Sequence, residues 1–220
     1  MTAKQAVFID ALGTLVEMEP PWVGLRAVVP DSVDDERLVQ AVKVEMAYYR
    51  DHASEGRDDA SVADLRERCA RVLSEGLGHE VDAEALVSSL SFRPYPDAGP
   101  ALEALRARGV RIVCLSNWDV SLTEVLESCG LGPHLDGAVS SAEAGASKPD
   151  PAPFRLALEV AECDPSEALH VGDTADEDLA GAAAAGISAL LLDRTSQASA
   201  PAGAVVISSL AEVEDHLDLP

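Results

Sequence analysis

The chain has 220 residues, which is enough for one large domain or for a core domain with a sizeable insertion. Hydrophobic residues make up 47% of it and charged residues 25%, as in ordinary globular proteins, and no apolar run approaches the roughly 20 residues that cross a bilayer. The 39 acidic and 16 basic side chains give a net charge of -23, which argues against nucleic acid and membrane surfaces as partners. A site for an anion must therefore gather its few cations, or a metal ion, in one place.

The first ten residues, MTAKQAVFID, lack the apolar stretch and the small-residue cleavage site of a secretory signal. We therefore expect them to lead into the first strand of the fold, and we expect a cytoplasmic location. The cysteines are far apart and include no CxxC pair, so we expect small buried apolar residues and neither a zinc site nor a disulfide framework. They are Cys69, Cys114, Cys129 and Cys163.

Beyond residue 97, short apolar runs alternate with helical patterns, which is typical of a parallel sheet flanked by helices. The predicted strands cover residues 5–10, 110–115, 137–140, 168–172, 188–192 and 204–207. The predicted helices cover residues 98–108, 120–129, 151–161, 175–185 and 209–216. We therefore expect an α/β fold whose core is a Rossmann-like, doubly wound parallel sheet. The low-complexity stretch SQASAPAG, residues 196–203, is predicted to be a flexible loop.

The stretch from residue 16 to residue 95 contains no convincing strand, but it shows helical spacing. Apolar side chains recur on one face at Leu38, Val42, Met46 and Tyr49, and on another at Val62, Leu65, Cys69 and Val72. Two segments resemble the capping boxes that begin helices, namely Ser32 to Asp35 and Ser61 to Asp64. An all-helical segment therefore interrupts the α/β pattern directly after its first strand.

This segment, which we call the cap, is predicted to form a domain of residues 16–95 inserted into a core domain of residues 1–15 and 96–220. Its boundaries are marked by Pro20-Pro21 on entry and by RPYPDAGP on return. An insertion at this point lies over the carboxyl ends of the strands, where open α/β sheets bind ligands. We therefore expect a movable lid.

Residues that carry chemistry follow four of the predicted strands. They are Asp10 and Thr14 in FIDALGTL, Ser116 and Asn117 in VCLSNWD, Lys148 in GASKPDPAPF, and Asp173 and Asp178 in HVGDTADEDLAGAAAAG. If the strands are parallel, all four groups meet in one crevice. Together they offer a nucleophile, hydroxyl and backbone donors, one cation and several carboxylates. That set is suited to covalent attack by an aspartate on a phosphoryl or carbon centre beside a hard divalent cation.

These four motifs, in this order, resemble those of the haloacid dehalogenase superfamily, in the branch with a helical cap after the first motif. The resemblance extends over almost the whole chain and includes the return from the cap, YPDAGPALEALRARG. It implies that Asp10 is the nucleophile, that Thr14 and Ser116 bind the transferring group, and that Lys148 holds both that group and Asp10. Asn117 and Leu12, beside these residues, are the candidate substrate-binding residues.

The resemblance also implies a Mg²⁺ ion as cofactor. Asp10, the backbone carbonyl of Leu12 and Asp173 would bind it, and Asp178 would support it through water or as a further ligand. Asp178 lies five residues after Asp173, where the family places its second acid. The adjacent Asp176 and Glu177 are interpreted as first-turn acids that favour the helix dipole.

Leu12 departs from the family pattern, because family phosphatases usually carry an aspartate there that protonates the leaving alcohol and later activates water. Such general acid–base help is typically worth roughly 10²- to 10⁴-fold in rate. The first interpretation is nevertheless a Mg²⁺-dependent phosphatase for a small phosphorylated metabolite. It would act slowly, or on compounds with good leaving groups such as acyl phosphates.

Two other interpretations stay open. Dehalogenase-like members also lack the second aspartate and resemble DALGTL, but they resemble SSN where this chain has Gly172-Asp173-Thr174, and carbon–halogen displacement needs no metal. Phosphonate hydrolysis is a related variant that uses a cap lysine as an imine former, and Lys43 is the only lysine in the cap. The third interpretation is a binding or regulatory protein with weak turnover or none.

The cap is expected to set the substrate. Its arginines are candidates for an anionic substrate tail, and two tryptophans are candidates for lining the pocket. They are Arg26, Arg50 and Arg57, and Trp22 and Trp118.

Overall fold

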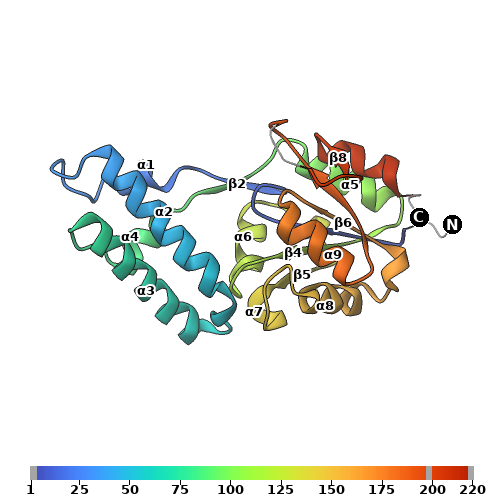
Figure 1. Ribbon diagram of the computed structural model, residues 1–220, viewed down its shortest axis with the longest axis horizontal. Coiled ribbons are helices and arrows are strands. Elements are labelled where there is room, and N and C mark those ends of the chain that lie inside the picture. Colours follow the sequence, from blue (N-terminus) through green and yellow to red (C-terminus); the bar gives the residue numbers. More distant parts are fainter. Residues whose placement is uncertain (1–3, 197–199, 218–220) are drawn as a thin grey trace.

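The computed structural model describes residues 4–196 and 200–217, and it shows a helical part beside an α/β part (Figure 1). The α/β part is built on a six-stranded sheet with the order β5-β4-β1-β6-β7-β8, in which every neighbouring pair is parallel. The strands are β1 (Ala6–Ile9), β4 (Arg111–Ser116), β5 (Gly137–Ser140), β6 (Ala168–Gly172), β7 (Ser188–Leu192) and β8 (Val205–Ile207). All six predicted strands are present, and the predicted α/β fold class is confirmed.

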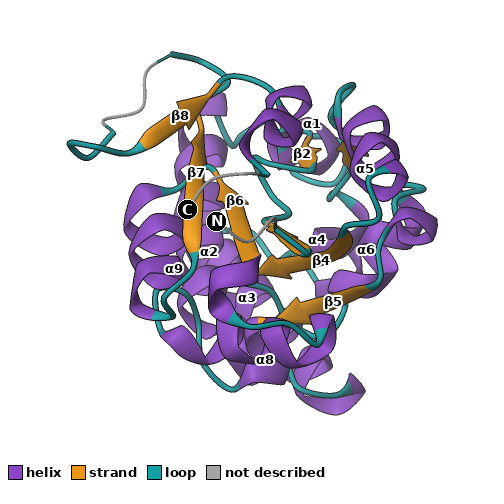
Figure 2. Cartoon of the chain, turned by 90° about the vertical axis from the view of Figure 1, so that its right-hand side faces the viewer, coloured by secondary structure: helices purple, strands orange, loops and turns teal. Residues whose placement is uncertain are grey.

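Helices cover both faces of this sheet (Figure 2). One face packs against α5 (Ala98–Ala107), α6 (Leu122–Ser128) and the 3₁₀ helix η5 (Leu210–His216). The other face packs against α8 (Pro151–Ala161) and α9 (Ala180–Ala184). Every residue of β1 and β6 is therefore buried, which explains why these strands read as continuous apolar runs rather than as alternating patterns.

Several connections depart from the predicted helices. The helix expected over residues 175–185 divides into a π-helical turn, η4 (Ala175–Leu179), and α9. The helix expected over residues 209–216 is the 3₁₀ helix η5. Further short turns are η2 (Gly132–His134), α7 (Ser141–Ala144) and η3 (Pro165–Glu167).

The cap contains four helices and a 3₁₀ turn, and it has a hydrophobic cluster of its own. Its elements are α1 (Pro21–Leu25), α2 (Asp35–His52), η1 (Ala53–Glu55), α3 (Asp59–Leu77) and α4 (Ala83–Ser88). Leu38 and Val42 on α2 pack with Leu65 and Leu73 on α3, as the helical spacing predicts. This cluster contains no residue of the sheet or of the helices that cover it. The cap therefore buries its apolar faces against itself.

The expectation that residues 16–95 contain no strand is wrong. Val16–Met18 (β2) pairs antiparallel with Phe92–Pro94 (β3), at the two points where the chain enters and leaves the cap. Figure 1 shows this ribbon crossing between the two parts. A strand of three residues is too short to show an alternating pattern, and its partner lies far away in the sequence, so no local signal predicts the pairing.

The predicted capping boxes are also displaced. The cap of α2 is Asp34, whose side chain accepts from the amide of Arg37. The cap of α3 is Asp58, which forms a capping box with Ser61. Aspartate and serine cap helices about equally well, so a sequence that offers both within a few residues does not fix the first turn.

Part of the predicted loop over residues 196–203 lies outside the described residues, namely residues 197–199. In the parts of the chain that the structure describes, no helix combines the length and the apolar character needed to cross a membrane.

Candidate active site

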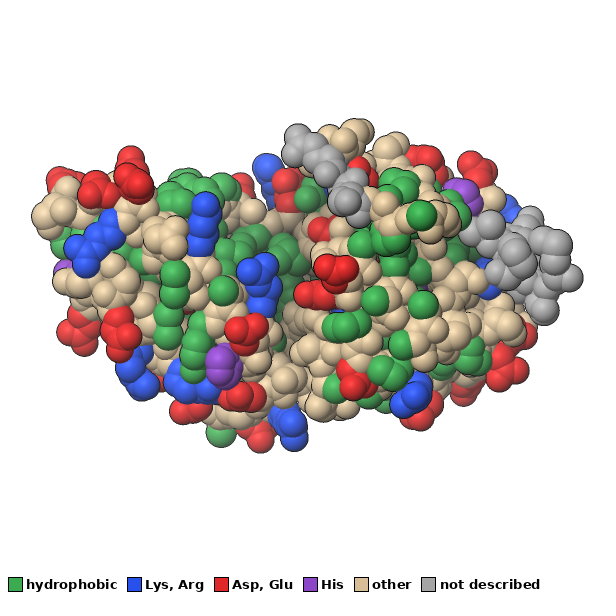
Figure 3. Space-filling model, in the orientation of Figure 1, with side chains coloured by type: hydrophobic (Ala, Val, Ile, Leu, Met, Phe, Trp, Pro, Cys, Tyr) green, Lys and Arg blue, Asp and Glu red, His purple; other side chains and the backbone are tan. Residues whose placement is uncertain are grey.

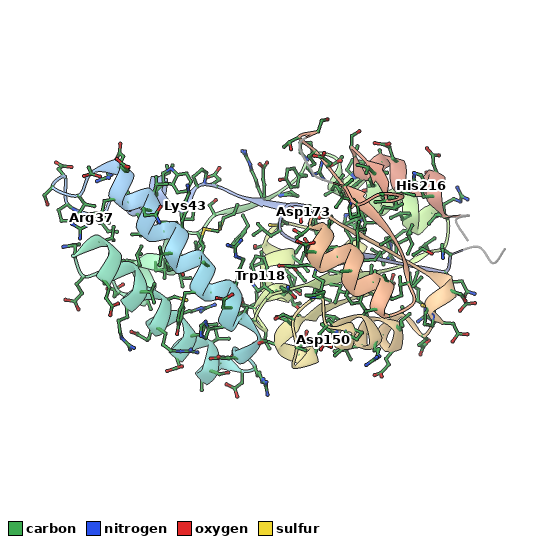
Figure 4. All side chains as sticks on the ribbon, in the orientation of Figure 1. Arg37, Lys43, Trp118, Asp150, Asp173 and His216 are labelled. Atoms are coloured by element: carbon green, nitrogen blue, oxygen red, sulfur yellow. The ribbon has the colours of Figure 1, made fainter. Side chains whose placement is uncertain are left out.

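The carboxyl ends of the central strands face the cap across a cavity of about 900 Å³, which we call the central cavity. Figure 3 shows the surface hollowed between the two parts, and Figure 4 shows Asp173 and Trp118 on the side of the core that faces the cap. The structure brings most of the predicted site residues to the lining of this cavity: Asp10, Leu12, Ser116, Asn117, Lys148, Asp173 and Asp178. The parallel topology therefore unites four motifs that are far apart in the sequence.

Asp10 follows β1 directly and is only 5% exposed. Its Oδ1 accepts hydrogen bonds from Ser116 Oγ at 3.0 Å and from Lys148 Nζ at 2.7 Å. Within the described residues its Oδ2 accepts no hydrogen bond. One oxygen of this carboxylate is thus held in place, while the other is left for a ligand.

Lys148 lies in the loop that precedes α8, and its ammonium is buried. It donates to Asp10, to Asp178 Oδ1 at 2.6 Å and to the carbonyl of Leu115 at 3.2 Å, which uses all three of its donors. Burial by itself would lower the pKa of Lys148, but the two carboxylates hold it well above its ordinary value. Lys148 therefore carries a permanent positive charge between two carboxylates.

Asp178 is almost completely buried, and both of its oxygens accept hydrogen bonds from protein groups. Oδ1 accepts from Lys148 and lies 2.9 Å from His170 Nε2, and Oδ2 accepts from the amide of Thr174 at 2.9 Å. Burial by itself would raise the pKa of Asp178, but the charge of Lys148 and the hydrogen bond to His170 hold it well below its usual range. This predicted metal residue is thus bonded to Lys148, to His170 of β6 and to the turn at Thr174 that follows β6.

His170 is a site residue that the sequence analysis missed. It is fully buried on β6, with its ring edge-on to Phe154 at 5.0 Å between centroids. Its only sequence signal is a histidine inside the otherwise apolar strand ALHVG. His170 links the central strand to the Asp178–Lys148–Asp10 chain.

Asp173 lies against the turn that follows Asp10. A Cβ atom added at Gly13 would stand 2.1 Å from Asp173 Oδ2, and Gly13 has a φ of 88°, so both space and backbone require glycine there. Burial, and then the charge of Asp178, raise the pKa of Asp173. Burial raises the pKa of Asp10 to about 6, against the opposing charge of Lys148, and the charges of Asp178 and Asp173 add to the rise. The carboxylates of Asp10 and Asp173 therefore lie within electrostatic reach of each other.

The donor set fits a magnesium ion. Asp10, Leu12 and Asp173 line the cavity together, so carboxylate oxygens and a main-chain carbonyl are available to a hard cation. The described residues contain no group of three or more histidine, cysteine, aspartate or glutamate side chains arranged to hold a metal by themselves. Mg²⁺ needs no such cage, because it usually retains several waters and is bound through one or two carboxylates.

Both polar atoms of the Asn117 side chain form hydrogen bonds within the protein. Its Oδ1 accepts from the amide of Lys148 at 2.7 Å, and its Nδ2 donates to the carbonyl of Lys148 at 3.1 Å and to Glu177 Oε2 at 2.9 Å. Asn117 thus positions the backbone that carries Lys148. The interpretation of Glu177 as a first-turn acid alone is incomplete, since Glu177 bonds to Asn117 and also lines the cavity.

Thr14 is the predicted site residue that the structure does not bring to the cavity. Its side chain is completely buried, and its hydroxyl has no hydrogen-bond partner among the described residues. Its amide donates to the carbonyl of Ala11 at 3.2 Å, within the turn that follows β1.

Comparisons with known proteins agree with this geometry. Residues 4–186 match the protein family described as haloacid dehalogenase-like hydrolase. The chain belongs to this family. The haloacid dehalogenase-like hydrolase domain-containing protein 3 of Bos taurus is 35% identical over 105 residues, which cover 48% of this chain and 42% of that protein. The phosphoserine phosphatase of Thermus thermophilus is 35% identical over 137 residues, which cover 59% of this chain and 55% of that protein.

The L-2-haloacid dehalogenase of Xanthobacter autotrophicus has the same fold, with a TM-score of 0.72 and 25% identity over 97% of this chain and 98% of that chain. The alignments with the two curated relatives span only about half of their length. The predicted resemblance to the haloacid dehalogenase superfamily is confirmed.

In this haloacid dehalogenase-like hydrolase, the cap supplies the wall of the cavity opposite Asp10. That wall includes Glu45, Tyr49 and Arg50 of α2 and Arg66 and Cys69 of α3. Tyr49 also joins the cap to the core, since its hydroxyl donates to Asp119 Oδ2 at 3.0 Å.

Of the three candidate arginines, Arg50 alone lines the cavity. Arg26 pairs with Asp35 at 2.8 Å, and Arg57 donates to the carbonyl of Ser54 at 3.2 Å. Of the two tryptophans, Trp118 lines the cavity, whereas Trp22 packs against the hydrophobic cluster of the cap. Lys43 is exposed on α2 and is absent from the lining. Figure 4 shows it on the cap, away from Asp173.

Proposed function

We propose that this hydrolase is a Mg²⁺-dependent phosphatase for a small phosphorylated metabolite, with Asp10 as its nucleophile. The observation that carries the proposal is Asp173, a carboxylate that lies against the turn at Gly13 after Asp10 and lines the same cavity as Asp10. A second carboxylate at that place opposes ionisation of the nucleophile unless a cation is held between the two. Transfer of a charged phosphoryl group needs such a cation, whereas displacement of halide from carbon does not.

In the proposed reaction, Asp10 attacks phosphorus while Ser116 and Lys148 orient it. The free Oδ2 of Asp10 forms a bond to phosphorus as the bond to the leaving oxygen breaks, and the electron pair of that bond departs with the oxygen. Ser116 and Lys148 hold Oδ1 of Asp10, and the charge of Lys148 offsets the charge of the transferring group. Water then attacks the aspartyl phosphate, which releases phosphate and restores the carboxylate of Asp10.

Mg²⁺, held by Asp10, Asp173 and the carbonyl of Leu12, would supply positive charge opposite the phosphoryl oxygens. We assign Asp178 to the support of this site through Lys148, because protein groups already occupy both of its oxygens. Asn117 is likewise assigned to positioning, since it holds the backbone of Lys148 on both sides.

Leu12 limits the leaving groups that this site accepts. Its half-buried side chain lines the cavity beside Asp10 and has no proton to give or to take. The leaving group must therefore depart as an anion that is stable in water. Acyl and aryl phosphates meet this condition, whereas simple alkyl phosphates do not.

We infer that the cap, residues 16–95, moves as a lid on a core of residues 1–15 and 96–220. Its separate hydrophobic cluster and the thin β2–β3 connection support this division. Three further hydrogen bonds join the parts away from this connection. The Tyr49 hydroxyl donates to Asp119 Oδ2 at 3.0 Å and accepts from the amide of Asp119 at 3.4 Å, and the amide of Val120 donates to the carbonyl of Gly56 at 3.0 Å.

The test is release of phosphate from acetyl phosphate and from p-nitrophenyl phosphate. We expect activity with Mg²⁺, none with EDTA, and a loss of at least about 10³-fold in Asp10→Asn. Asp31→Asn, at an exposed position outside the cavity, serves as the control and should match the wild type. Activity that is indifferent to EDTA would contradict the metal, and full activity of Asp10→Asn would contradict the nucleophile.

Dehalogenation is a second candidate, favoured by Leu12 and by the likeness to the Xanthobacter enzyme. Chloride release from 2-chloropropionate without metal would support it over the phosphatase. Phosphonate hydrolysis would need a cap lysine in the site, and the only cap lysine, Lys43, lies outside the lining of the cavity. A protein that binds beryllium fluoride with Mg²⁺ but releases no phosphate from any substrate would instead be a binding or regulatory member of the family.

A further inference from the structure

Glu45 is a buried carboxyl group in the wall that the cap presents to the central cavity. It lies in the middle of α2, it is only 6% exposed, and it lines the same cavity as Asp10. Neither the helical pattern of the cap nor the chemistry at Asp10 requires an acid at this position. A buried acid is costly to keep unless something pairs with it.

Among the described residues, no cation pairs with Glu45. In the described parts of the chain, no lysine, arginine or histidine lies within ion-pairing distance of its carboxyl group. The polar group that acts on the Glu45 carboxyl from the protein side is the thiol of Cys69 on α3, which is a weak donor. The favoured partner of a buried carboxylate is a cationic donor. At Glu45, such a donor can be supplied by a ligand bound in the central cavity.

The charges of the cavity favour a cationic group over an anionic one. Eight acidic and three basic side chains line it, and the most buried of the three basic groups, Lys148, already bonds to Asp10 and Asp178. The other two are Arg50, which is exposed, and Arg66, which is half-buried. Charges in contact with water contribute little to binding, whereas a buried charge must be matched by its ligand.

We propose that Glu45 forms a subsite for an ammonium group on the leaving part of the substrate, so that the enzyme selects phosphorylated compounds that carry an amine. This inference rests on the proposed function, because it takes the phosphoryl group to bind at Asp10. The substrate then spans the cavity from the core wall to the cap wall, with its two charged ends recognised by different parts of the fold.

The test compares the affinities of matched ligands, so it does not depend on turnover. A series of ω-aminoalkyl phosphates of increasing chain length is titrated calorimetrically with Mg²⁺ at about pH 8, above the pKa of about 7 to which burial raises Glu45. Each compound is paired with the alkyl phosphate that carries a methyl group in place of the ammonium. At the best chain length we expect the ammonium compound to bind about tenfold to a hundredfold more tightly, as for a charge-assisted hydrogen bond.

Glu45→Gln keeps the shape of the side chain and removes its charge, so it should reduce this preference to within about twofold. Glu75→Gln, an exposed acid on α3 that does not line the central cavity, should leave the preference unchanged. Glu45→Met is a second variant in case glutamine disturbs the fold, and thermal unfolding checks both.

Equal binding of the two series at every length would overturn the inference, as would a preference that persists in both Glu45 variants. ω-Hydroxyalkyl phosphates of the same length can form a hydrogen bond but carry no positive charge, so an affinity equal to that of the ammonium compounds would overturn it as well. These outcomes are distinct from failure of the proposed function. That failure would appear as a wild type that releases no phosphate from acetyl phosphate or p-nitrophenyl phosphate.

Discussion

The core wall and the cap wall of the central cavity differ in whether their charged side chains have ionic partners within the protein. On the core wall, Lys148 bonds to Asp10 at 2.7 Å and to Asp178 at 2.6 Å, and each of the three is held further by strand or turn groups. On the cap wall, neither Glu45 nor Arg50 has an ion pair within the described residues.

Under the proposed function, this difference assigns the reaction to the core wall and the selection of the substrate to the cap wall. A preorganised set of charges lowers the barrier to a reaction without reorganising during it, which suits the core wall. A wall whose buried acid lacks a cationic partner gains that partner only from a bound molecule, which suits the choice of substrate. Changes on the core wall should therefore affect the reaction with every substrate, and changes on the cap wall should affect the choice between substrates.

The largest effect is expected from Lys148→Met. It leaves Asp10 and Asp178 buried without their common cation, so the free energy of unfolding should fall by about 3 to 5 kcal/mol. Phosphate release should fall by about 10³-fold, because the donor to Oδ1 of Asp10 is lost. Urea titration and the acetyl phosphate assay measure the two effects. Lys43→Met, at an exposed site outside the cavity, is the matched control, and equal behaviour of the two variants would contradict a special role for Lys148.

Leu12→Asp should raise the hydrolysis of alkyl phosphates by about 10²-fold, since it places an acid beside the leaving oxygen. Acetyl phosphate should gain far less, because its leaving group needs no proton. Leu12→Asn has a similar size and no acid. An equal gain with asparagine would show that proton transfer is not the cause, and no gain in either variant would show that leucine does not limit the rate.

Glu45→Gln should change how stability depends on pH. Burial raises the pKa of Glu45 from its ordinary 4.5 to about 7, although the Cys69 thiol opposes the rise. In this interval the unfolded chain gives up a proton that the folded chain keeps, so the wild type loses stability as the pH rises from about 4.5 to about 7. The loss amounts to about 3 kcal/mol, and the glutamine variant should not show it.

The difference between the two pH–stability curves isolates Glu45, because the groups common to both proteins cancel. The nearby Cys69 and Tyr49 stay protonated throughout, since burial raises the pKa of the thiol to about 12 and that of the phenol well above its usual value. Parallel curves would mean that Glu45 ionises normally in the folded protein.

The smallest effect is expected from Tyr49→Phe, which removes the hydrogen bond from α2 to Asp119. The free energy of unfolding should fall by about 1 kcal/mol. Hydrogen exchange at the amide of Val120, which donates to Gly56 across the same contact, should become faster if the cap opens there. Tyr48→Phe removes a hydroxyl that bonds to Arg68 within the cap, so it should leave that exchange rate unchanged.

The sequence by itself determined the sheet, the order of the four motifs and most residues of the core wall. Strands such as ALHVG are continuous apolar runs bounded by turn residues, and that signal is local. Parallel strands place their carboxyl ends at one edge, so Asp10, Lys148 and Asp173 could be expected to meet once the strands were known.

The tertiary structure alone decided which groups pair. Asn117 could not be seen as the residue that holds Lys148, nor His170 as the partner of Asp178, because each pair joins separate segments through side chains. The burial of Glu45 was equally hidden, since a glutamate among the apolar residues of an amphipathic helix is expected on the surface until the fold buries it. The physical reason is the same in each case: local periodicity depends on neighbours along the chain, whereas the solvation and pairing of a charge depend on what the fold brings against it.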